Sequence, residues 1–432
     1  MVTDRSFEEL NLWQRIFAEH WDSFALAYAN THGSLPPEHW RENVDRMLFC
    51  GDIREGYYEY LCEHCGETRK VGFTCKSRLC LRCFKTAVDD WLEQARSVLF
   101  EGVVHRQVVL TVPQSLRPLI LSDAAFLKAY MDAGAAAVKG LIEEWRPRHR
   151  IRVGIMAVLQ LHGRSGNQNP HLHFVVSEGG VDAKGHWRAV NYFDTRKLRK
   201  KWQYHVLTAL KKAVRGTAYQ SEWTLRLGSM FRKYPTGFDC DCMPEKGPVE
   251  RLIVYLCKYV SSPPISLRRI VSYDGQKVSY RYDDHRRGKV RETISAVDFI
   301  ARMIRHLPPK GFRMVRYYGI YARPVRNKIH ALVADVLQKL ARQAEAVARY
   351  FTRRHNQNDR GCDAMADIGK APMRCARCGS TDLMLLRIWN KHKGIVFDAI
   401  RDGPGHAYAA ADADPVRLRP AVPWFEQLVF SM

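Results

Sequence analysis

The chain has 432 residues, with 68 Lys and Arg against 45 Asp and Glu, so its formal net charge is +23. That length leaves room for two or three domains, and so large a basic excess favours a polyanionic partner, because phosphate contacts release bound counterions. Residues 1–15 lack the apolar core of a secretory signal, and no segment approaches the run of about 20 apolar residues that spans a bilayer. We therefore expect a cytoplasmic protein that binds nucleic acid.

The spacing of apolar residues predicts an α+β chain. Helices are expected where apolar residues recur every three or four positions, and strands where they alternate or are β-branched. In chain order, the sequence predicts helices over 7–50 with a second start at 36–37, short strands over 57–83, a helix over 84–100, a strand over 103–112, a helix over 121–145, strands over 151–162 and 171–177, helices over 192–214 and 250–262, a hairpin over 270–293, a helix over 296–306, an extended segment over 311–321 and a helix over 328–352.

Two closely spaced cysteine pairs indicate a zinc site. Cys62 and Cys65 are separated by fourteen residues from Cys80 and Cys83. Two such knuckles supply the four thiolates of a tetrahedral Zn²⁺ shell, which has no open position and is therefore structural. Cys75, between the pairs, is either a substitute ligand or, as we favour, a buried thiol.

Basic residues around the zinc motif and along the predicted helix 192–214 are candidate DNA contacts. Lys76 and Arg78 flank the zinc motif, while Arg196 and Lys200 represent the basic helix. The alternatives are an architectural zinc knuckle and a solvated helix face.

A further cysteine pair lies near the C-terminus. Cys375 and Cys378 repeat the short spacing, but no matching pair lies close to them. Cys362 and His355 could complete a metal site there.

The segment 170–176 carries two histidines on a predicted strand. Side chains alternate between the faces of a strand, so His171 and His173 point the same way while their neighbours enter the core. The preceding strand would bring His162 near His171 across a short loop. Three imidazoles with open positions are suited to a catalytic Mg²⁺ or Mn²⁺ ion, although a lone His-x-His pair is as often structural.

Two tyrosines in the predicted helix 250–262 are candidate nucleophiles. Tyr255 and Tyr259 are four residues apart and therefore share a helix face, with Lys258 as a candidate cation nearby. Taken alone, the pair is more typical of half-buried helix aromatics, but its combination with the His-x-His strand, the zinc motif and the net charge favours nucleophiles. Tyr317 and Tyr321 have the same spacing, but their extended pattern favours base stacking or core packing.

Together these motifs resemble the two-tyrosine HUH superfamily of rolling-circle enzymes, and most closely transposases of the insertion-sequence-ninety-one type. The resemblance is carried by the cysteine finger with Thr74–Arg78, by Leu110–Pro113, by Asn169–His173, by Tyr255–Tyr259 and by Arg316–Gly319. The second knuckle departs from the family pattern around its cysteines but keeps the ligands.

The resemblance implies a fold and a mechanism. The expected fold is a catalytic HUH endonuclease domain, with an RRM-like antiparallel sheet and flanking helices, preceded by a helical and zinc-finger domain. The division would be 1–100 for the zinc-binding region, 101–327 for the catalytic domain and 328–432 for a C-terminal helix and tail. Either tyrosine would form a 5′-phosphotyrosine on single-stranded DNA at transposon ends and target, with a host helicase as partner because no P-loop is present.

Other functions share some of these features. A plasmid replication initiator or conjugative relaxase would use the same chemistry, and terminal-sequence specificity would separate them. A zinc-dependent DNA-binding regulator would use the histidines and tyrosines as core residues and would not nick DNA. A decayed element copy is a third alternative, but no motif residue is missing.

Overall fold

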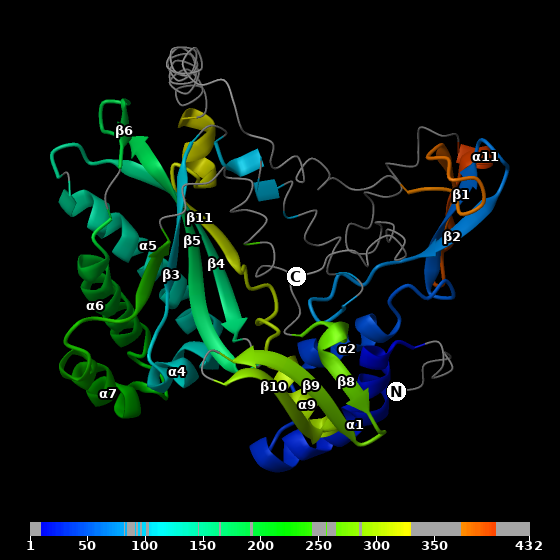
Figure 1. The fold of residues 1–432 in the computed structure, drawn as a ribbon, viewed down its shortest axis with the longest axis horizontal. Helices are drawn as coiled ribbons and strands as arrows, with labels where there is room; N and C mark the ends of the chain where they lie inside the picture. Colours follow the sequence, from blue (N-terminus) through cyan, green and yellow to red (C-terminus); the bar gives the residue numbers. More distant parts are fainter. Residues whose placement is uncertain are drawn as a thin grey trace. The chain divides into compact units, whose positions relative to one another are not determined.

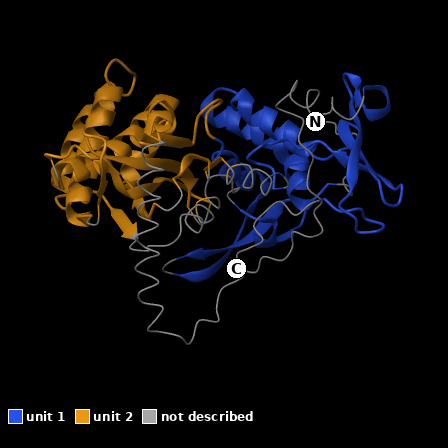
Figure 2. Ribbon diagram, turned by 90° about the horizontal axis from the view of Figure 1, so that it is seen from above, with its two compact units in different colours: residues 1–90, 261–307, 362–432 blue, residues 91–260, 308–361 orange. Residues whose placement is uncertain are grey.

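The computed structural model describes residues 10–81, 83, 91, 94–95, 97–100, 103–145, 147–163, 166–190, 193–243, 256, 265–284, 287–329 and 373–402. The chain forms two compact units, coloured separately in Figure 2. Unit 1 comprises residues 1–90, 261–307 and 362–432, and unit 2 comprises residues 91–260 and 308–361. Both units are therefore built from segments that are distant in sequence.

A helical core in unit 1 joins the N-terminal helices to residues 265–307. Helix α1 begins with a capping box between Asn11 and Gln14, and its aromatic face packs against helix α9, with Trp13 and Phe299 in edge contact. The elements of this part are α1 (Leu12–His32), α2 (Glu38–Leu48), η3 (Leu267–Arg269), α9 (Ala296–Ile304) and the antiparallel sheet β10-β9-β8 (Gly288–Ser295, Lys277–Asp284, Ile270–Tyr273).

A second sheet in unit 1 is made from two hairpins far apart in the chain. Its order is β13-β12-β1-β2, with all neighbours antiparallel, so that the hairpin β1–β2 pairs with β12 (Figure 1). The elements are β1 (Gly56–Cys62), β2 (Thr68–Gly72), β12 (Leu383–Asn390), β13 (Gly394–Asp398) and the short helix α11 (Ala399–Asp402). In the described part of the chain its buried cluster contains Tyr58, Ile388 and Phe397, with five partly buried apolar residues packed around them (Tyr60, Phe73, Leu385, Val396 and Ala399).

Unit 2 is built on an antiparallel sheet with the order β11-β4-β5-β3-β7, and β6 pairs with the far part of β5. Helices α5 and α6 pack against each other beside this sheet (Figure 1). The elements are β3 (His105–Leu110), η2 (Gln114–Leu116), α4 (Arg117–Ser122), α5 (Ala124–Trp145), β4 (Arg152–His162), β5 (Gln168–Val181), β6 (Trp187–Ala189), α6 (Thr195–Ala213), α7 (Gln220–Lys233), β7 (Cys240–Met243) and β11 (Val315–Gly319).

The two faces of this sheet differ in character. Leu172, Phe174 and Val176 of β5 enter the apolar core that also contains α5 and α6. A Cβ on Gly134 of α5 would lie 2.6 Å from the Phe174 ring, so helix and strand meet at a glycine. The intervening residues His171 and His173 therefore occupy the face turned away from α5.

The predicted fold class is confirmed: the chain combines helices with antiparallel sheets, and one cysteine cluster lies wholly in the N-terminal region while a second also takes in Cys375 and Cys378. The sequence did not predict α7, β7 or the pairing of β12 with β1. The compact units divide the chain at other positions and group 261–307 with the N-terminal helices. The predicted division into functional domains at residues 100 and 327 stays a prediction. None of the described helices is long and apolar enough to cross a membrane.

Candidate metal centres and catalytic face

The histidine pair lies on β5, a central strand of the unit 2 sheet. In the antiparallel register, His173 stands between Val109 of β3 and Val158 of β4, and His171 stands beside Gln160 of β4. Directly paired residues project from the same face, so Gln160 shares the histidine face. The two imidazole rings have their centroids 4.8 Å apart. The prediction that both histidines share one strand face therefore agrees with the strand pairing.

Hydrogen bonds orient both rings. His171 Nδ1 donates to the carbonyl oxygen of Asn169 at 2.7 Å, which leaves the lone pair on Nε2. His173 Nε2 lies 3.1 Å from Gln160 Oε1, and its Nδ1 lies 3.4 Å from Gln107 Nε2. Gln107 and Gln160 are both buried. Such contacts fix the ring orientation of a metal-binding histidine.

Both imidazoles are held in the neutral form, which is the form that binds a metal. Burial lowers the pKa of His173 to about 3, with a smaller contribution from neighbouring His171. Burial also lowers the pKa of His171, and the positive charge of Arg117 acts in the same direction. At neutral pH each ring therefore carries one lone pair: it lies on Nε2 in His171, and in His173 it lies on Nδ1, which accepts from Gln107 Nε2.

The predicted third ligand, His162, is displaced from this site. A register shift between Gln160 and His162 places His162 opposite Gln168, three residues along β5 from His171. At about 3.3 Å per residue this separation is roughly 10 Å. Among the described residues, no third His, Cys, Asp or Glu joins His171 and His173 in a metal-binding group. The bulge therefore brings Gln160, not His162, beside His171 in the strand pairing, and the identity of a third metal ligand stays a prediction.

The Gln160–His173 geometry fits two neighbouring ligands of an octahedral ion. Ligands at 2.0–2.1 Å from Mg²⁺ that subtend a right angle lie about 3.0 Å apart. The observed separation of Gln160 Oε1 and His173 Nε2 is 3.1 Å. A carbonyl oxygen beside two imidazoles is a donor set suited to Mn²⁺ or Mg²⁺.

The candidate nucleophiles Tyr255 and Tyr259, together with Lys258, lie outside the described residues. Of the predicted helix 250–262, only Leu256 is described, and it is helical and fully buried. The rival tyrosine Tyr321 packs in the interior and hydrogen-bonds to His105 on β3, which agrees with core packing. Tyr317 is half-buried and pairs with Met156.

Arg117, the first residue of α4, is a cation that the sequence reasoning missed. Its Nη1 donates to the carbonyl oxygen of Gln168 at 3.4 Å, and its Nε is buried without a hydrogen-bond partner. Burial is the main cause of the lowered pKa of His171, and the positive charge of Arg117 adds a smaller contribution in the same direction. Its position in the sequence could have indicated it, because this arginine comes shortly after the predicted strand 103–112, at the end of the turn that follows.

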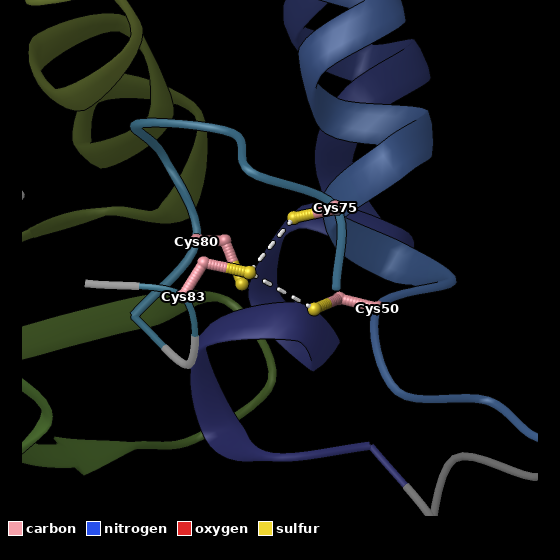
Figure 3. A group of neighbouring side chains, drawn as sticks. All are labelled: Cys50, Cys75, Cys80 and Cys83. Carbon is pink, nitrogen blue, oxygen red and sulfur yellow. Dashed lines mark hydrogen bonds between the residues drawn. The ribbon is translucent and has the colours of Figure 1, made fainter. Parts of the chain in front are cut away.

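The first cysteine cluster contains Cys50, Cys75, Cys80 and Cys83, whose sulfur atoms lie within 4.8 Å of one another (Figure 3). Cys83 Sγ lies 3.4 Å from Cys50 Sγ and 3.5 Å from Cys75 Sγ. The backbone amide of Gly51 donates to Phe73 at 2.9 Å, which brings the end of α2 beside the segment after β2. Cys75 is therefore a member of the cluster, as the less favoured sequence interpretation had it, and Cys50 was missed.

The second cluster contains Cys62, Cys65, Cys375 and Cys378, with sulfur atoms again within 4.8 Å. Cys62 faces Cys378 and Cys65 faces Cys375, each at 3.6 Å. The predicted single site of Cys62, Cys65, Cys80 and Cys83 is thus wrong in its grouping, because each pair belongs to a different cluster. The spacing of the pairs was correct, but the partners that complete each shell come from elsewhere.

The sulfur distances fit zinc rather than disulfides. Four thiolates at about 2.3 Å from a tetrahedral ion lie about 3.8 Å apart, whereas bonded sulfurs lie near 2.0 Å. The sulfur atoms of Cys50–Cys83, Cys75–Cys83, Cys62–Cys378 and Cys65–Cys375 lie 3.4 to 3.6 Å apart. Each cluster has the donor number and spacing of a structural Zn²⁺ site.

The candidate DNA-contacting residues lie at the surface. Lys76 and Arg78 are exposed beside the first cysteine cluster, and Arg196 and Lys200 are exposed on α6, whose opposite side buries Leu198. Their role in DNA binding stays a prediction.

Comparison with known proteins gives two family matches. A model described as a transposase zinc-binding domain matches residues 16–112, and a model described as a putative transposase matches residues 154–328. The first range contains the whole Cys50–Cys83 cluster, and the second contains the histidine strand.

Curated relatives match along most of their length. The chain is 28% identical over 353 residues to the transposase for insertion sequence element IS801 of Pseudomonas savastanoi pv. phaseolicola, which covers 78% of this chain and 82% of that protein. It is also 28% identical over 329 residues to the putative transposase y4qJ of Sinorhizobium fredii, covering 73% and 82%. Among solved structures, one match is TrwC complexed with a 27-mer DNA comprising the recognition hairpin and the cleavage site. The match covers 39% of this chain and 68% of that chain, at 18% sequence identity. Its TM-score is 0.20, which is too low to support an argument about the fold.

Proposed function

The chain belongs to the IS91-type family of insertion-sequence transposases, which carry an N-terminal zinc-binding domain, and we propose that it nicks and rejoins single-stranded DNA at element ends to drive rolling-circle transposition. The observation that carries this proposal is the polar face of the unit 2 sheet. There His171, His173 and Gln160 converge inside the segment that matches the putative transposase model.

These three side chains would hold the catalytic divalent ion. His171 Nε2 carries its lone pair in the tautomer that Asn169 fixes. His173 would present Nε2 beside Gln160 Oε1, with Nδ1–H donating to Gln107 once the amide of Gln107 is turned so that its oxygen faces the ring. A bound Mg²⁺ or Mn²⁺ supplies a Lewis acid that polarises the scissile phosphate.

Tyr255 or Tyr259 would be the nucleophile. The phenolic oxygen forms a bond to phosphorus while the bond from phosphorus to the 3′-oxygen breaks. The tyrosine proton passes to the leaving group, and the products are a 5′-phosphotyrosine and a free 3′-OH. The ester retains the energy of the broken bond, so attack by a 3′-OH can rejoin DNA without ATP. The second tyrosine can accept another strand before the first link is resolved.

Cations assist this step from the protein side. Lys258 lies between the two tyrosines in sequence and can offset charge on the phosphate. Arg117 adds a positive charge beside His171, with a buried Nε that lacks a hydrogen-bond partner. Arg196, Lys200, Lys76 and Arg78 would contact the backbone of the single strand, and the zinc-binding region would help to select element ends. Unwinding would fall to a host helicase.

The test is formation of a covalent protein–DNA adduct. The protein is incubated with end-labelled single-stranded element ends and Mn²⁺ and resolved on a denaturing gel. We expect an adduct that requires the metal, that disappears in the Tyr255→Phe/Tyr259→Phe double variant and that is strongly reduced in His171→Ala. If the wild-type protein binds the DNA but never nicks it or becomes linked, the nuclease proposal fails and a zinc-dependent DNA-binding regulator is the better account.

A further inference from the structure

The second cysteine cluster is formed by two knuckles of the same local shape. In one, the amide of Gly66 donates to Cys62 O at 2.9 Å, and in the other the amide of Gly379 donates to Cys375 O at 2.9 Å. Gly66 has φ +71° and Gly379 has φ +76°, a left-handed conformation that favours glycine. The two turns therefore present their cysteine pairs in matching geometry.

The backbone after each knuckle repeats the match. The amide of Cys62 donates to Glu67 O at 2.9 Å, and the amide of Cys375 donates to Ser380 O at 2.8 Å. Each turn thus closes on itself and aims both thiols to one side. Two such turns facing each other form the four-thiolate arrangement of a structural zinc site.

Contacts beyond the sulfurs join the two turns. The amide of Glu63 donates to Asp382 O at 3.0 Å, and Cys62 pairs with Leu383 at the end of the β1–β12 ladder. Arg377 and Glu67 form an ion pair at 3.6 Å. The contact between the two cysteine pairs therefore extends the backbone pairing of β1 with β12 and does not depend on the side chains alone.

The sheet that carries this cluster has too small a core to be stable by itself. Among the described residues, three fully buried side chains form its apolar cluster, Tyr58, Ile388 and Phe397, and the residues packed around them are only partly buried. Segments of this kind usually depend on a metal, and metal binding then supplies folding free energy directly.

We infer that Cys62, Cys65, Cys375 and Cys378 bind a second structural Zn²⁺ ion, which fastens the C-terminal hairpin β12–β13 to the N-terminal hairpin β1–β2. This ion is distinct from the zinc of Cys50, Cys75, Cys80 and Cys83. Two of its ligands lie beyond residues 16–112, the range of the zinc-binding-domain match. The family domain is therefore completed in this chain by a segment that follows the catalytic region.

The first test counts zinc in the full chain by metal analysis of purified protein. We expect two zinc ions per chain in the wild type, and one in either Cys62→Ser/Cys65→Ser or Cys375→Ser/Cys378→Ser. The variant with all four substitutions should still hold one, because both pairs serve the same ion. Cys240→Ser/Cys242→Ser is the matched control, since neither thiol belongs to a cluster, and it should keep two.

A conservative variant separates ligand loss from misfolding. Cys378→His should retain two zinc ions, because imidazole replaces thiolate in Cys₃His sites, whereas Cys378→Ser should lose the second ion. If Cys375→Ser/Cys378→Ser still holds two ions, or if the four-fold variant holds none, the assignment is wrong.

A second measurement uses the wild-type protein alone. Cys378 is exposed, so without a bound metal its thiol is open to alkylation. We expect the four thiols to be protected in zinc-loaded protein and to become reactive together as a chelator removes one ion. Alkylation of Cys375 and Cys378 in protein that keeps both zinc ions would overturn the inference.

Discussion

Replacing Gln160 tests whether it is a metal ligand or only a hydrogen-bond partner of His173. Gln160→Ala removes the acceptor that lies 3.1 Å from His173 Nε2, in a position where the glutamine is 7% exposed. Leaving one buried polar group unsatisfied costs about 1–3 kcal/mol of the free energy of unfolding. Loss of a residue that only orients a metal-binding histidine lowers metal affinity by about 10-fold to 100-fold, and loss of a ligand lowers it by at least as much. We therefore expect the Mn²⁺ concentration for half-maximal adduct formation to rise by at least about 10-fold.

Two further variants make this measurement decisive. Gln160→Glu keeps an oxygen in place and adds a negative charge, so it should restore or strengthen metal affinity. Gln203→Ala is the matched control, because Gln203 is equally buried and donates to Met230 O and Tyr234 O away from the site. It should lose similar stability in urea unfolding without changing the Mn²⁺ requirement. An unchanged Mn²⁺ requirement in Gln160→Ala, alongside reduced stability, would refute the assignment of Gln160 as a ligand.

Three further predictions concern the surroundings of the site. Gly134→Ala should lower the free energy of unfolding by about 1–3 kcal/mol and slow nicking, because its Cβ would crowd the Phe174 ring behind the histidine strand. Gly140→Ala on the same helix meets only ordinary contacts and should raise the free energy of unfolding by about 0.5–1 kcal/mol. Urea unfolding that ranks the two variants the other way would contradict this prediction. His105 is buried with its pKa lowered from 6.5 to about 4, so its contribution to stability is present above pH 6.5 and is lost as the pH falls toward 4. His105→Gln should reduce the slope of unfolding free energy against pH in that window by at most about 1.4 kcal/mol per pH unit, and equal slopes in urea unfolding would count against it. Arg117→Ala should slow single-turnover adduct formation on the order of 10-fold to 100-fold with little change in DNA affinity measured by filter binding, and a loss confined to affinity would place Arg117 outside the reacting site.

Local sequence patterns predicted the parts of the site that depend on one strand. The alternation around His171 and His173 is a property of a single strand, so it gave the shared face before any pairing was known. The third position depends on the register between two strands. A bulge near the end of β4 shifted His162 along β5 and left Gln160 beside His171. No periodicity in the sequence encodes that bulge, because either residue fits the polar face.

The cysteine grouping could not be predicted for a related reason. The spacing of Cys62, Cys65, Cys80 and Cys83 is that of one zinc site, and spacing arguments consider only neighbours in the chain. The actual partners are set by the pairing of β1 with β12 and by the contact of Gly51 with Phe73. For the same reason the helix over 296–306 was predicted, but its packing on α1 was not.

The distance along the chain between the two halves of the second cysteine cluster has a consequence for synthesis. Cys65 and its partner Cys375 are 310 residues apart. At about 5–20 residues per second, the hairpin β1–β2 leaves the ribosome roughly 15–60 s before β12 exists. During that interval Cys62 and Cys65 have the spacing to capture a metal together with Cys80 and Cys83, in the arrangement that the sequence alone suggests. Early closure of the first cluster by Cys50 and Cys75, which also precede β12 in the chain, would remove this competitor.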